Sequence, residues 1–288
     1  MAARAAPAGY ALWCERSGRL LWADAATAQL RAWAPATGRQ HSWRLPDSLN
    51  CFALTASVER LLLGLSSRLA IFDLATGALI PIGAVAPGQP GIRITDGRCD
   101  RQGRFVFGTG ADGPQAPPGA FYRLNHDLSL ERLPLGEAGL ATGICFSPDG
   151  RTMFYADVAL GAIRRCGYHP CSGEIGSARP FVEAGAVAGE PGGAVVDADG
   201  CLWSARRGAG QLVRFTPGGM VERVLDLGAQ PGWLAFGGPA LDTLYVTTAG
   251  AQACAGQGGA APAGILAYAP GMSGLAEQRF LGRLPSRA

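Results

Sequence analysis

The chain has 288 residues, of which 48% are hydrophobic and 16% charged, and its formal net charge is +3. All 25 residues of the lysine-plus-arginine total are arginine, and none forms a run longer than the pairs Arg164–Arg165 and Arg206–Arg207. Without a clustered basic face a nucleic-acid partner is not expected, and without lysine Schiff-base and P-loop chemistry are excluded. No apolar stretch has the length of a signal-peptide core or a membrane helix, so we expect a cytoplasmic protein with no membrane partner.

Six segments of the chain share one pattern, a polar turn followed by a short apolar run of β-forming residues. In chain order they are residues 17–25, 59–66, 102–110, 149–158, 199–207 and 241–249. Each is followed by a second apolar run, and these second runs are residues 28–33, 68–74, 119–124, 161–166, 210–215 and 264–270. Both alternating faces of the runs are largely apolar, which is expected for strands packed between neighbouring sheets.

Equivalent positions in these segments recur every 42 to 50 residues, at Gly18, Arg60, Gly103, Gly150, Gly200 and Asp242. This period is the length of one four-stranded propeller blade. The sequence therefore predicts an all-β fold, a six-bladed β-propeller with four-stranded antiparallel blades, as a single domain over residues 1–288. We expect residues 1–8 and 282–288 to be loose tails, and the stretches 87–95, 111–119 and 249–263 to lie near a mouth of the central tunnel.

The spacing of cysteine and histidine offers no metal or nucleophile motif. The three histidines, His41, His126 and His169, fall in outer turns and are interpreted as ordinary surface residues. The eight cysteines contain no CxxC pair and are interpreted as free thiols in a reducing compartment; they are Cys14, Cys51, Cys99, Cys145, Cys166, Cys171, Cys201 and Cys254. No GxSxG segment is present, so a serine hydrolase is not supported.

Four segments, in order along the chain, resemble the SMP-30/gluconolactonase/luciferin-regenerating-enzyme (LRE) family of six-bladed propellers. They are RITDGRCDRQGRFVFGTG from Arg93, TGICFSPDGRTMFYAD from Thr142, PGGAVVDADGCLWSAR from Pro191 and FGGPALDTLYVTTA from Phe236. The resemblance implies hydrolysis of a sugar lactone, assisted by a divalent metal at one end of the tunnel. Such a metal polarises the lactone carbonyl and lowers the pKa of a bound water.

The family's metal ligands are a Glu, an Asn and an Asp, and the resemblance aligns each of them with a different residue in this chain. The aligned positions are Gly9, Thr142 and Gly192, and Gly192 also stands at the position of the family's general base. Glycine has no ligand atom, and a single hydroxyl is a poor anchor for a hard cation. We therefore expect no metal cofactor and assign no catalytic residue. A Ca, Zn or Mn ion would need substitute ligands, for which Glu190 is the candidate.

The substrate-facing positions of the family are partly kept. The resemblance aligns Arg93 with a family arginine that contacts the sugar acid, and Thr95 with a family asparagine. Trp233, in a Pro-Gly-Trp segment before the last blade, is a candidate for stacking on a sugar ring. Asp96 is interpreted as a residue that caps backbone amides.

Two functions stay open at this point. The first is a sugar-lactone (aldonolactone) hydrolase whose metal-dependent chemistry is altered because the ligands are absent. The second is a non-catalytic propeller that uses Arg93 to bind a small sugar acid or similar anion at the tunnel mouth. In both, the partner is a small molecule.

Overall fold

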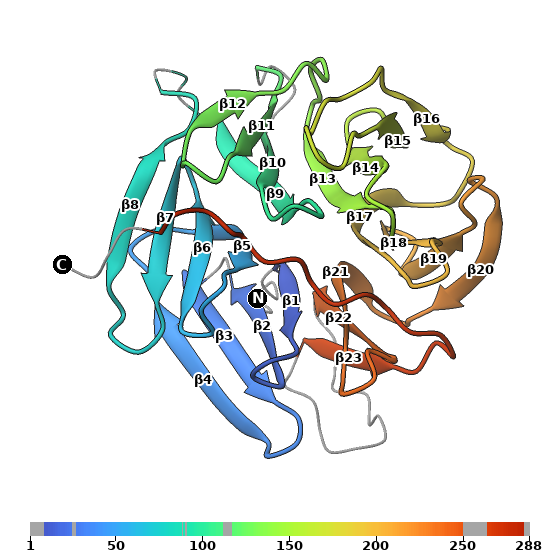
Figure 1. Cartoon of the computed structure of the whole chain (residues 1–288). Coiled ribbons are helices and arrows are strands. Elements are labelled where there is room, and N and C mark those ends of the chain that lie inside the picture. The colour runs from blue at the N-terminus through green and yellow to red at the C-terminus, as the bar shows by residue number, and fades with distance from the viewer. Residues whose placement is uncertain are drawn as a thin grey trace, which may run out of the picture.

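The computed structural model describes residues 9–24, 27–87, 89, 91–111, 117–249 and 264–284. Within these residues every regular secondary-structure element is a β-strand. The strands form six antiparallel sheets around a central axis (Figure 1). The predicted all-β six-bladed propeller is confirmed. Residues 1–8 and 285–288 of the predicted tails, Cys254 and most of the predicted loops 111–119 and 249–263 lie outside the described residues. No helix in the described ranges is long and apolar enough to span a membrane.

The strands follow one another blade by blade along the chain. Blades 1 and 2 consist of β1 (Ala11–Cys14), β2 (Arg19–Asp24), β3 (Gln29–Ala34), β4 (Arg39–Arg44), then β5 (Leu49–Leu54), β6 (Arg60–Leu65), β7 (Arg68–Asp73) and β8 (Leu79–Ala84). Blades 3 and 4 consist of β9 (Arg93–Cys99), β10 (Phe105–Gly110), β11 (Phe121–Leu124), β12 (Leu130–Arg132), then β13 (Ala141–Phe146), β14 (Thr152–Asp157), β15 (Ala162–Gly167) and β16 (Arg179–Val182). Blades 5 and 6 consist of β17 (Glu190–Val196), β18 (Leu202–Arg207), β19 (Gln211–Phe215), β20 (Val221–Asp226), then β21 (Gln230–Gly237), β22 (Thr243–Ala249) and β23 (Ile265–Tyr268).

The sixth blade differs from the prediction of four strands, because the described residues give it three. After β23 the chain reaches Pro270, which has no N–H to donate to a sheet, and then Gly271 at a φ of +84°. Arg223 of the neighbouring blade donates to the carbonyl of Pro270 at 2.7 Å. The chain therefore leaves the sheet instead of returning along it.

The first strand of each blade is the innermost one, and neighbouring inner strands pack against each other around the axis (Figure 1). They are β1, β5, β9, β13, β17 and β21. We call the end of the axis where these strands begin the upper end, and the end where they finish the lower end. Blades 1 and 6 close the ring through the stacked rings of Trp13 and Tyr245, whose centroids are 5.6 Å apart.

The turn aspartates of the repeat explain why its sequence pattern recurs. Asp100 follows β9, and its Oδ1 accepts hydrogen bonds from the backbone N–H groups of Gln102 and Arg104 at 2.9 and 3.0 Å. Asp197 follows β17 and accepts from the amides two and four residues further on, at 3.1 and 2.9 Å. These bonds satisfy amides that the turn leaves unpaired, so the turn closes between the first and second strands of the blade.

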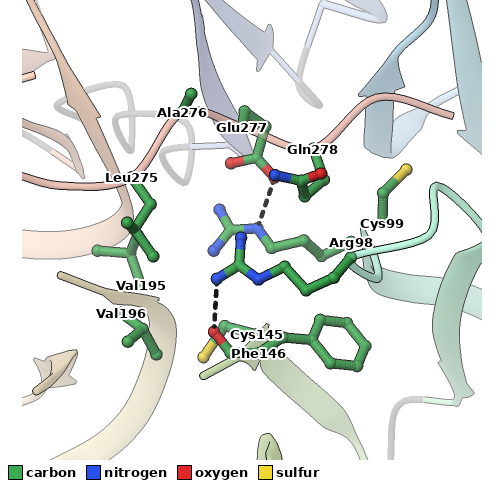
Figure 2. A pocket seen from close by; sticks show the side chains of 11 residues that line it. Arg98, Cys99, Cys145, Phe146, Val195, Val196, Leu275, Ala276, Glu277 and Gln278 are labelled. Carbon is green, nitrogen blue, oxygen red and sulfur yellow. Dashed lines mark hydrogen bonds and ion pairs between the residues drawn. The ribbon is translucent and has the colours of Figure 1, made fainter. Parts of the chain in front are cut away.

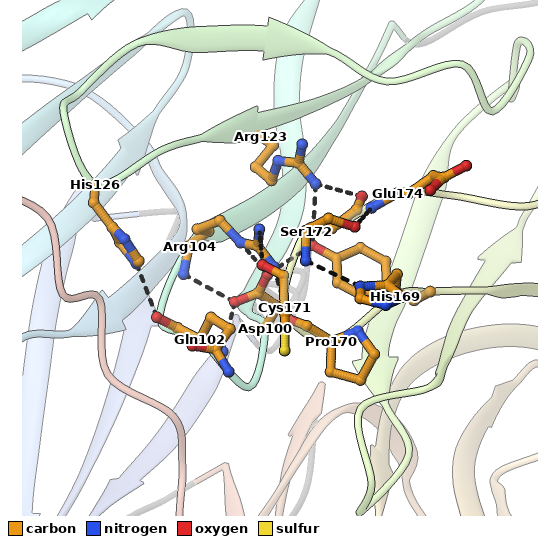
Figure 3. Close-up of polar contacts among 12 residues, drawn as sticks. Asp100, Gln102, Arg104, Arg123, His126, His169, Pro170, Cys171, Ser172 and Glu174 are labelled. Atoms are coloured by element: carbon orange, nitrogen blue, oxygen red, sulfur yellow. Dashed lines mark hydrogen bonds and ion pairs between the residues drawn. The ribbon is translucent and has the colours of Figure 1, made fainter.

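A polar network joins blades 3 and 4 beside this turn (Figure 3). Asp100 Oδ2 accepts from Arg104 Nε at 2.6 Å and from the Tyr168 hydroxyl at 2.6 Å. The terminal nitrogens of Arg104 donate to the carbonyls of Pro170 and Cys171 at 3.0 and 3.1 Å. Burial, together with the Asp100 charge, raises the pKa of Tyr168. Because the buried Asp100 and Arg104 are paired with each other, the network holds the two blades together.

The C-terminal segment 272–283, here called the strap, crosses the lower end of the propeller (Figure 1). At one end of the strap, the carbonyl of Ser273 accepts from the amide of Ala198 in blade 5 at 2.9 Å. Near the other end, the amide of Phe280 donates to the carbonyl of Leu54 in blade 2 at 2.7 Å. The strap therefore bridges blades that lie on different sides of the axis.

An ion pair on the axis fastens the middle of the strap. Glu277 Oε1 lies 3.2 Å from Nε of Arg98, which projects from β9 (Figure 2). A terminal nitrogen of Arg98 also donates to the carbonyl of Ala194 at 3.2 Å. A cavity of about 30 Å³ remains beside Arg98.

Candidate active site

A cavity of about 190 Å³ lies at the upper end of the axis, with residues from all six blades in its wall. Five residues that the sequence analysis selected line it: Gly9, Arg93, Thr95, Thr142 and Trp233. Gly192 and Glu190 are not among the lining residues. Because every inner strand begins at this end, residues far apart in the sequence meet here.

Strand β9 carries two of the lining side chains, Arg93 and Thr95. Alternate residues of a strand point to the same face, so both reach the cavity. The Thr95 hydroxyl donates to the carbonyl of Ala141 in β13 at 2.7 Å. This bond uses the hydroxyl proton, so Thr95 faces the cavity mainly as a hydrogen-bond acceptor.

Trp233 contributes the large aromatic side chain of the wall. Its amide donates to Thr247 Oγ1 at 2.9 Å, and that hydroxyl donates to the carbonyl of Gly9 at 3.0 Å. The Trp233 ring also lies against Tyr10, with ring centroids 6.4 Å apart. Trp233 is thus held in place by blades 1 and 6 together.

Gly9, which the resemblance aligns with a family glutamate, has surroundings that leave no room for a side chain. A Cβ on Gly9 would lie 1.8 Å from the carbonyl oxygen of Ala23. Real Cβ atoms do not approach backbone this closely, so a glutamate here requires a different path of the main chain. The sequence identified the position, and the structure adds that its backbone is packed directly against β2.

Thr142 and Gly192, the other two residues that the resemblance aligns with metal ligands, have different surroundings. Thr142 is buried, and its Oγ1 has no hydrogen-bond partner among the described residues. A Cβ on Gly192 would meet its nearest neighbours at 3.4 to 3.5 Å, which is ordinary van der Waals contact. A side chain larger than glycine is therefore accommodated at residue 192 but not at residue 9.

Asp96 lies beneath the cavity and is fully enclosed. Its carboxylate accepts from the amide of Gly97 at 2.8 Å and from the amide of Ile144, in blade 4, at 3.0 Å. Burial raises the pKa of Asp96, against the opposing effect of the Ile144 amide and the Arg98 charge. As the sequence analysis expected, Asp96 caps backbone amides, and it does so between two blades.

The family of the chain follows from sequence comparison. The model for the SMP-30/Gluconolactonase/LRE-like region matches residues 10–250, which include all six inner strands. The chain belongs to this family. A relative named L-arabinolactonase, from Azospirillum brasilense, is 43% identical over 83% of this chain and 79% of its own length. A 6-deoxy-6-sulfogluconolactonase from Pseudomonas putida is 31% identical over 82% and 81%.

Solved structures of the family share the architecture. A calcium-binding protein, regucalcin, from Agrobacterium tumefaciens superposes with a TM-score of 0.85 at 25% identity, over 98% of this chain and 95% of its own. A luciferin-regenerating enzyme has the same TM-score of 0.85 at 22% identity, over 96% of each chain, which supports the fold alone.

The residues that the resemblance aligns with the family's metal ligands supply few donor atoms for a divalent cation. Gly9 and Gly192 have no donor atoms, and the Asp96 carboxylate already accepts two backbone amides. Among the described residues no group of three or more His, Cys, Asp or Glu side chains could hold a metal ion. Glu190, the candidate substitute, has a side chain that is 67% exposed and lies outside the cavity wall.

Histidine and cysteine supply no alternative centre within the described ranges. His126 Nε2 lies 2.8 Å from the carbonyl of Gln102, and His169 Nδ1 accepts from the amide of Ser172 at 3.1 Å, both in outer turns (Figure 3). None of the described histidines lines the cavity. Burial raises the pKa of the Cys145 thiol to about 12, so this thiol stays protonated and is a poor nucleophile.

Sequence analysis missed Asn50 and Arg207, which also line the cavity. Asn50 lies at the start of β5, outside the four segments that resemble the family, and Arg207 is the last residue of β18. A register argument could have found Arg207, because antiparallel pairing places the end of β18 beside the start of β17. That start lies at the upper end of the axis, where the cavity is.

Proposed function

We propose that this protein hydrolyses a small sugar lactone in the upper cavity, by a route that does not depend on a divalent cation at the family's three ligand positions. The observation that carries the proposal is the cavity itself, which gathers Arg93, Thr95 and Trp233 in one wall. Its volume of about 190 Å³ suits a single small ring, because drug-sized ligands occupy pockets of roughly 300–1,000 Å³. The 43% identity to L-arabinolactonase supports an aldonolactone as the substrate class.

The wall has the polar groups that a sugar lactone needs. Arg93 offers a planar fork of N–H donors to ring hydroxyls or to the carboxylate of the product. Thr95 supplies an acceptor for a sugar hydroxyl, because its own proton is used by Ala141. The indole of Trp233 covers one side of the space, as aromatic rings do in carbohydrate sites.

The metal-independent part of the proposal rests on the donor set. A hard cation is held by several oxygen ligands, with carboxylates to balance its charge. Neither carboxylate of the family pattern is present, since Gly9 and Gly192 replace them. We expect Ca²⁺, Zn²⁺ and Mn²⁺ to bind weakly, without stoichiometric retention.

The test is hydrolysis by protein treated with a chelator and then freed of it by dialysis. L-Arabinono-1,4-lactone and D-glucono-1,5-lactone are the substrates, with acid release followed in a pH-stat and metal content measured by elemental analysis. We expect turnover above the spontaneous rate, unchanged by chelation. Loss of activity on chelation and its return with Ca²⁺, Zn²⁺ or Mn²⁺ would overturn the metal-independent route. No turnover on either lactone or on other aldonolactones would overturn the enzyme assignment.

A second candidate function is non-catalytic binding of a sugar acid. The described lining residues include two guanidinium groups, on Arg93 and Arg207, and no carboxylate. Such a wall favours an anion whether or not hydrolysis occurs. This function is favoured over the enzyme if calorimetry detects binding of L-arabinonate while the corresponding lactone is not hydrolysed.

A further inference from the structure

Arg207 brings a positive charge to the side of the cavity that blade 5 forms. It is the last residue of β18, and the strand register pairs it with Glu190 at the start of β17. Gly192, the position of the family's general base, lies in the same short stretch of β17. Arg207 reaches the cavity wall from this corner, and Gly192 does not.

The neighbouring Arg206 shows what a structural arginine of this strand looks like. It is completely buried, and its guanidinium donates to the three carbonyls of residues 187–189 at 2.9 to 3.2 Å. Arg207 differs in its exposure and in the pairing of its Nε, although one terminal nitrogen of Arg206 also has no hydrogen-bond partner among the described residues. Its side chain is 38% exposed, and its Nε has no hydrogen-bond partner among the described residues. The chain therefore uses one arginine of the pair as an anchor and presents the other to the cavity.

The charge of Arg207 is only weakly neutralised. Its nearest carboxylate, Glu190, has an Oε2 that lies 3.8 Å from an Arg207 terminal nitrogen, on a side chain that is 67% exposed. Solvent screens such a pair strongly. No carboxylate is present among the described lining residues to compensate the guanidinium.

Two further lining residues carry buried donors that lack partners. They are Asn50, through Nδ2, and Thr142, through Oγ1. Both atoms are buried. Buried polar atoms are normally hydrogen-bonded, so two unpaired groups in one cavity wall point to a ligand that completes them. The cavity wall is therefore rich in hydrogen-bond donors and in positively charged groups.

We propose that Arg207 is a catalytic residue. Its guanidinium would polarise the lactone carbonyl, which is the role that the resemblance assigns to the metal in the family. The proposal rests on the lactone hydrolysis proposed above. The N–H groups of Arg207 donate to the carbonyl oxygen of the lactone, and these hydrogen bonds strengthen as negative charge builds on that oxygen. Asn50 and Thr142 supply additional donors to the same oxygen or its neighbours.

The reaction balances without a further reactant. A water oxygen bonds to the carbonyl carbon, and the π electron pair moves to the carbonyl oxygen, where Arg207 stabilises it. The attacking water releases a proton to a second water. The tetrahedral intermediate then collapses, the bond from the carbonyl carbon to the ring oxygen breaks, and the ring oxygen takes up a proton from water. The product is the open hydroxy acid, which ionises to the carboxylate.

The experiment compares chelator-treated wild type with Arg207→Met and Arg93→Met on L-arabinono-1,4-lactone. Arg207→Met keeps the apolar stem and removes the charge, so we expect kcat to fall about 10²–10³-fold with little change in KM, as for the loss of an oxyanion donor. Arg93→Met is expected to raise KM with kcat largely kept, because Arg93 binds ground-state substrate. Added guanidinium ion, well below denaturing concentration, should partly restore kcat to Arg207→Ala.

Arg44→Met is the matched control, because Arg44 is exposed on β4 at the outside of blade 1. Its activity should equal that of wild type, and thermal unfolding should show that all variants fold. A kcat for folded Arg207→Met within about threefold of wild type would overturn the proposal while leaving lactone hydrolysis in place. Activity that requires Zn²⁺, Mn²⁺ or Ca²⁺ would also overturn it. Wild type without activity would instead overturn the proposed function, and the role of Arg207 with it.

Discussion

Replacing Glu277 by glutamine should destabilise the protein strongly, although Glu277 lies in a C-terminal segment outside every blade. In the ion pair with Arg98, the arginine side chain is 9% exposed and the glutamate side chain 15% exposed. Glutamine keeps the shape and removes the charge, which leaves the Arg98 guanidinium buried with its hydrogen bond to the carbonyl of Ala194 and without its carboxylate partner. Breaking a buried pair in this way costs about 3–5 kcal/mol.

The assay is the midpoint of urea and thermal unfolding. For a protein somewhat larger than 150–250 residues, each kcal/mol corresponds to roughly 2–4 °C, so we expect Tm to fall by about 6–20 °C. Glu183→Gln is the matched control, because Glu183 is exposed, and its effect should stay within about 0.5 kcal/mol. Equal midpoints for Glu277→Gln and Glu183→Gln would refute the view that the strap is held by a buried charge.

Three further predictions follow from single sites. Gly9→Ala should lower the free energy of unfolding by about 1–3 kcal/mol or more, because its methyl group would overpack against Ala23. Gly192→Ala should change the free energy of unfolding little. Similar urea midpoints for the two variants would contradict the packing described. Asp100→Asn should lower stability by about 3–5 kcal/mol, because it leaves the buried Arg104 without its counter-charge; a loss below about 1 kcal/mol in urea unfolding would show that Arg104 is solvated. Burial raises the pKa of Asp96, so this group stabilises the fold at pH below about 4 and loses that contribution as pH rises through its raised folded pKa. Urea unfolding should therefore show a larger penalty for Asp96→Asn at pH 4 than at pH 7, and the reverse order would refute the sign.

The propeller could be predicted from sequence because each blade repeats the same local signals. The turn aspartates Asp100 and Asp197 satisfy amides within their own turns, so the information is contained in a few neighbouring residues. The three-stranded sixth blade and the strap could not be predicted in the same way. Glu277 and Arg98 are far apart in sequence. A single Glu among polar and apolar neighbours forms no sequence pattern from which its ion-pair partner could be predicted.

The candidate site was predictable where it rests on family positions and unpredictable where it rests on geometry. Arg93, Thr95, Thr142 and Trp233 were selected from sequence and share one cavity. Arg207 was passed over as half of an arginine pair, because sequence cannot tell an anchoring arginine from one that faces a cavity. That distinction depends on the loop carbonyls of residues 187–189, which accept hydrogen bonds from Nε and one terminal nitrogen of Arg206.

Gly9 and Gly192, which the resemblance aligns with metal ligands, differ in the space available for a side chain. This difference affects which substitutions could restore a metal ligand. Gly192 accepts a Cβ in ordinary contact, so a carboxylate could return there by one substitution. Gly9 cannot follow, because its Cβ would meet the backbone of Ala23 at 1.8 Å, and β2 would have to move first. A carboxylate restored at residue 192 alone would not assemble a cation site. It would instead place a negative charge in the corner reached by Arg207 and weaken that residue as an electrophile. Under the proposed mechanism, glycine at residue 192 therefore favours the arginine site, because it adds no second carboxylate beside Glu190, whose Oε2 lies 3.8 Å from an Arg207 terminal nitrogen.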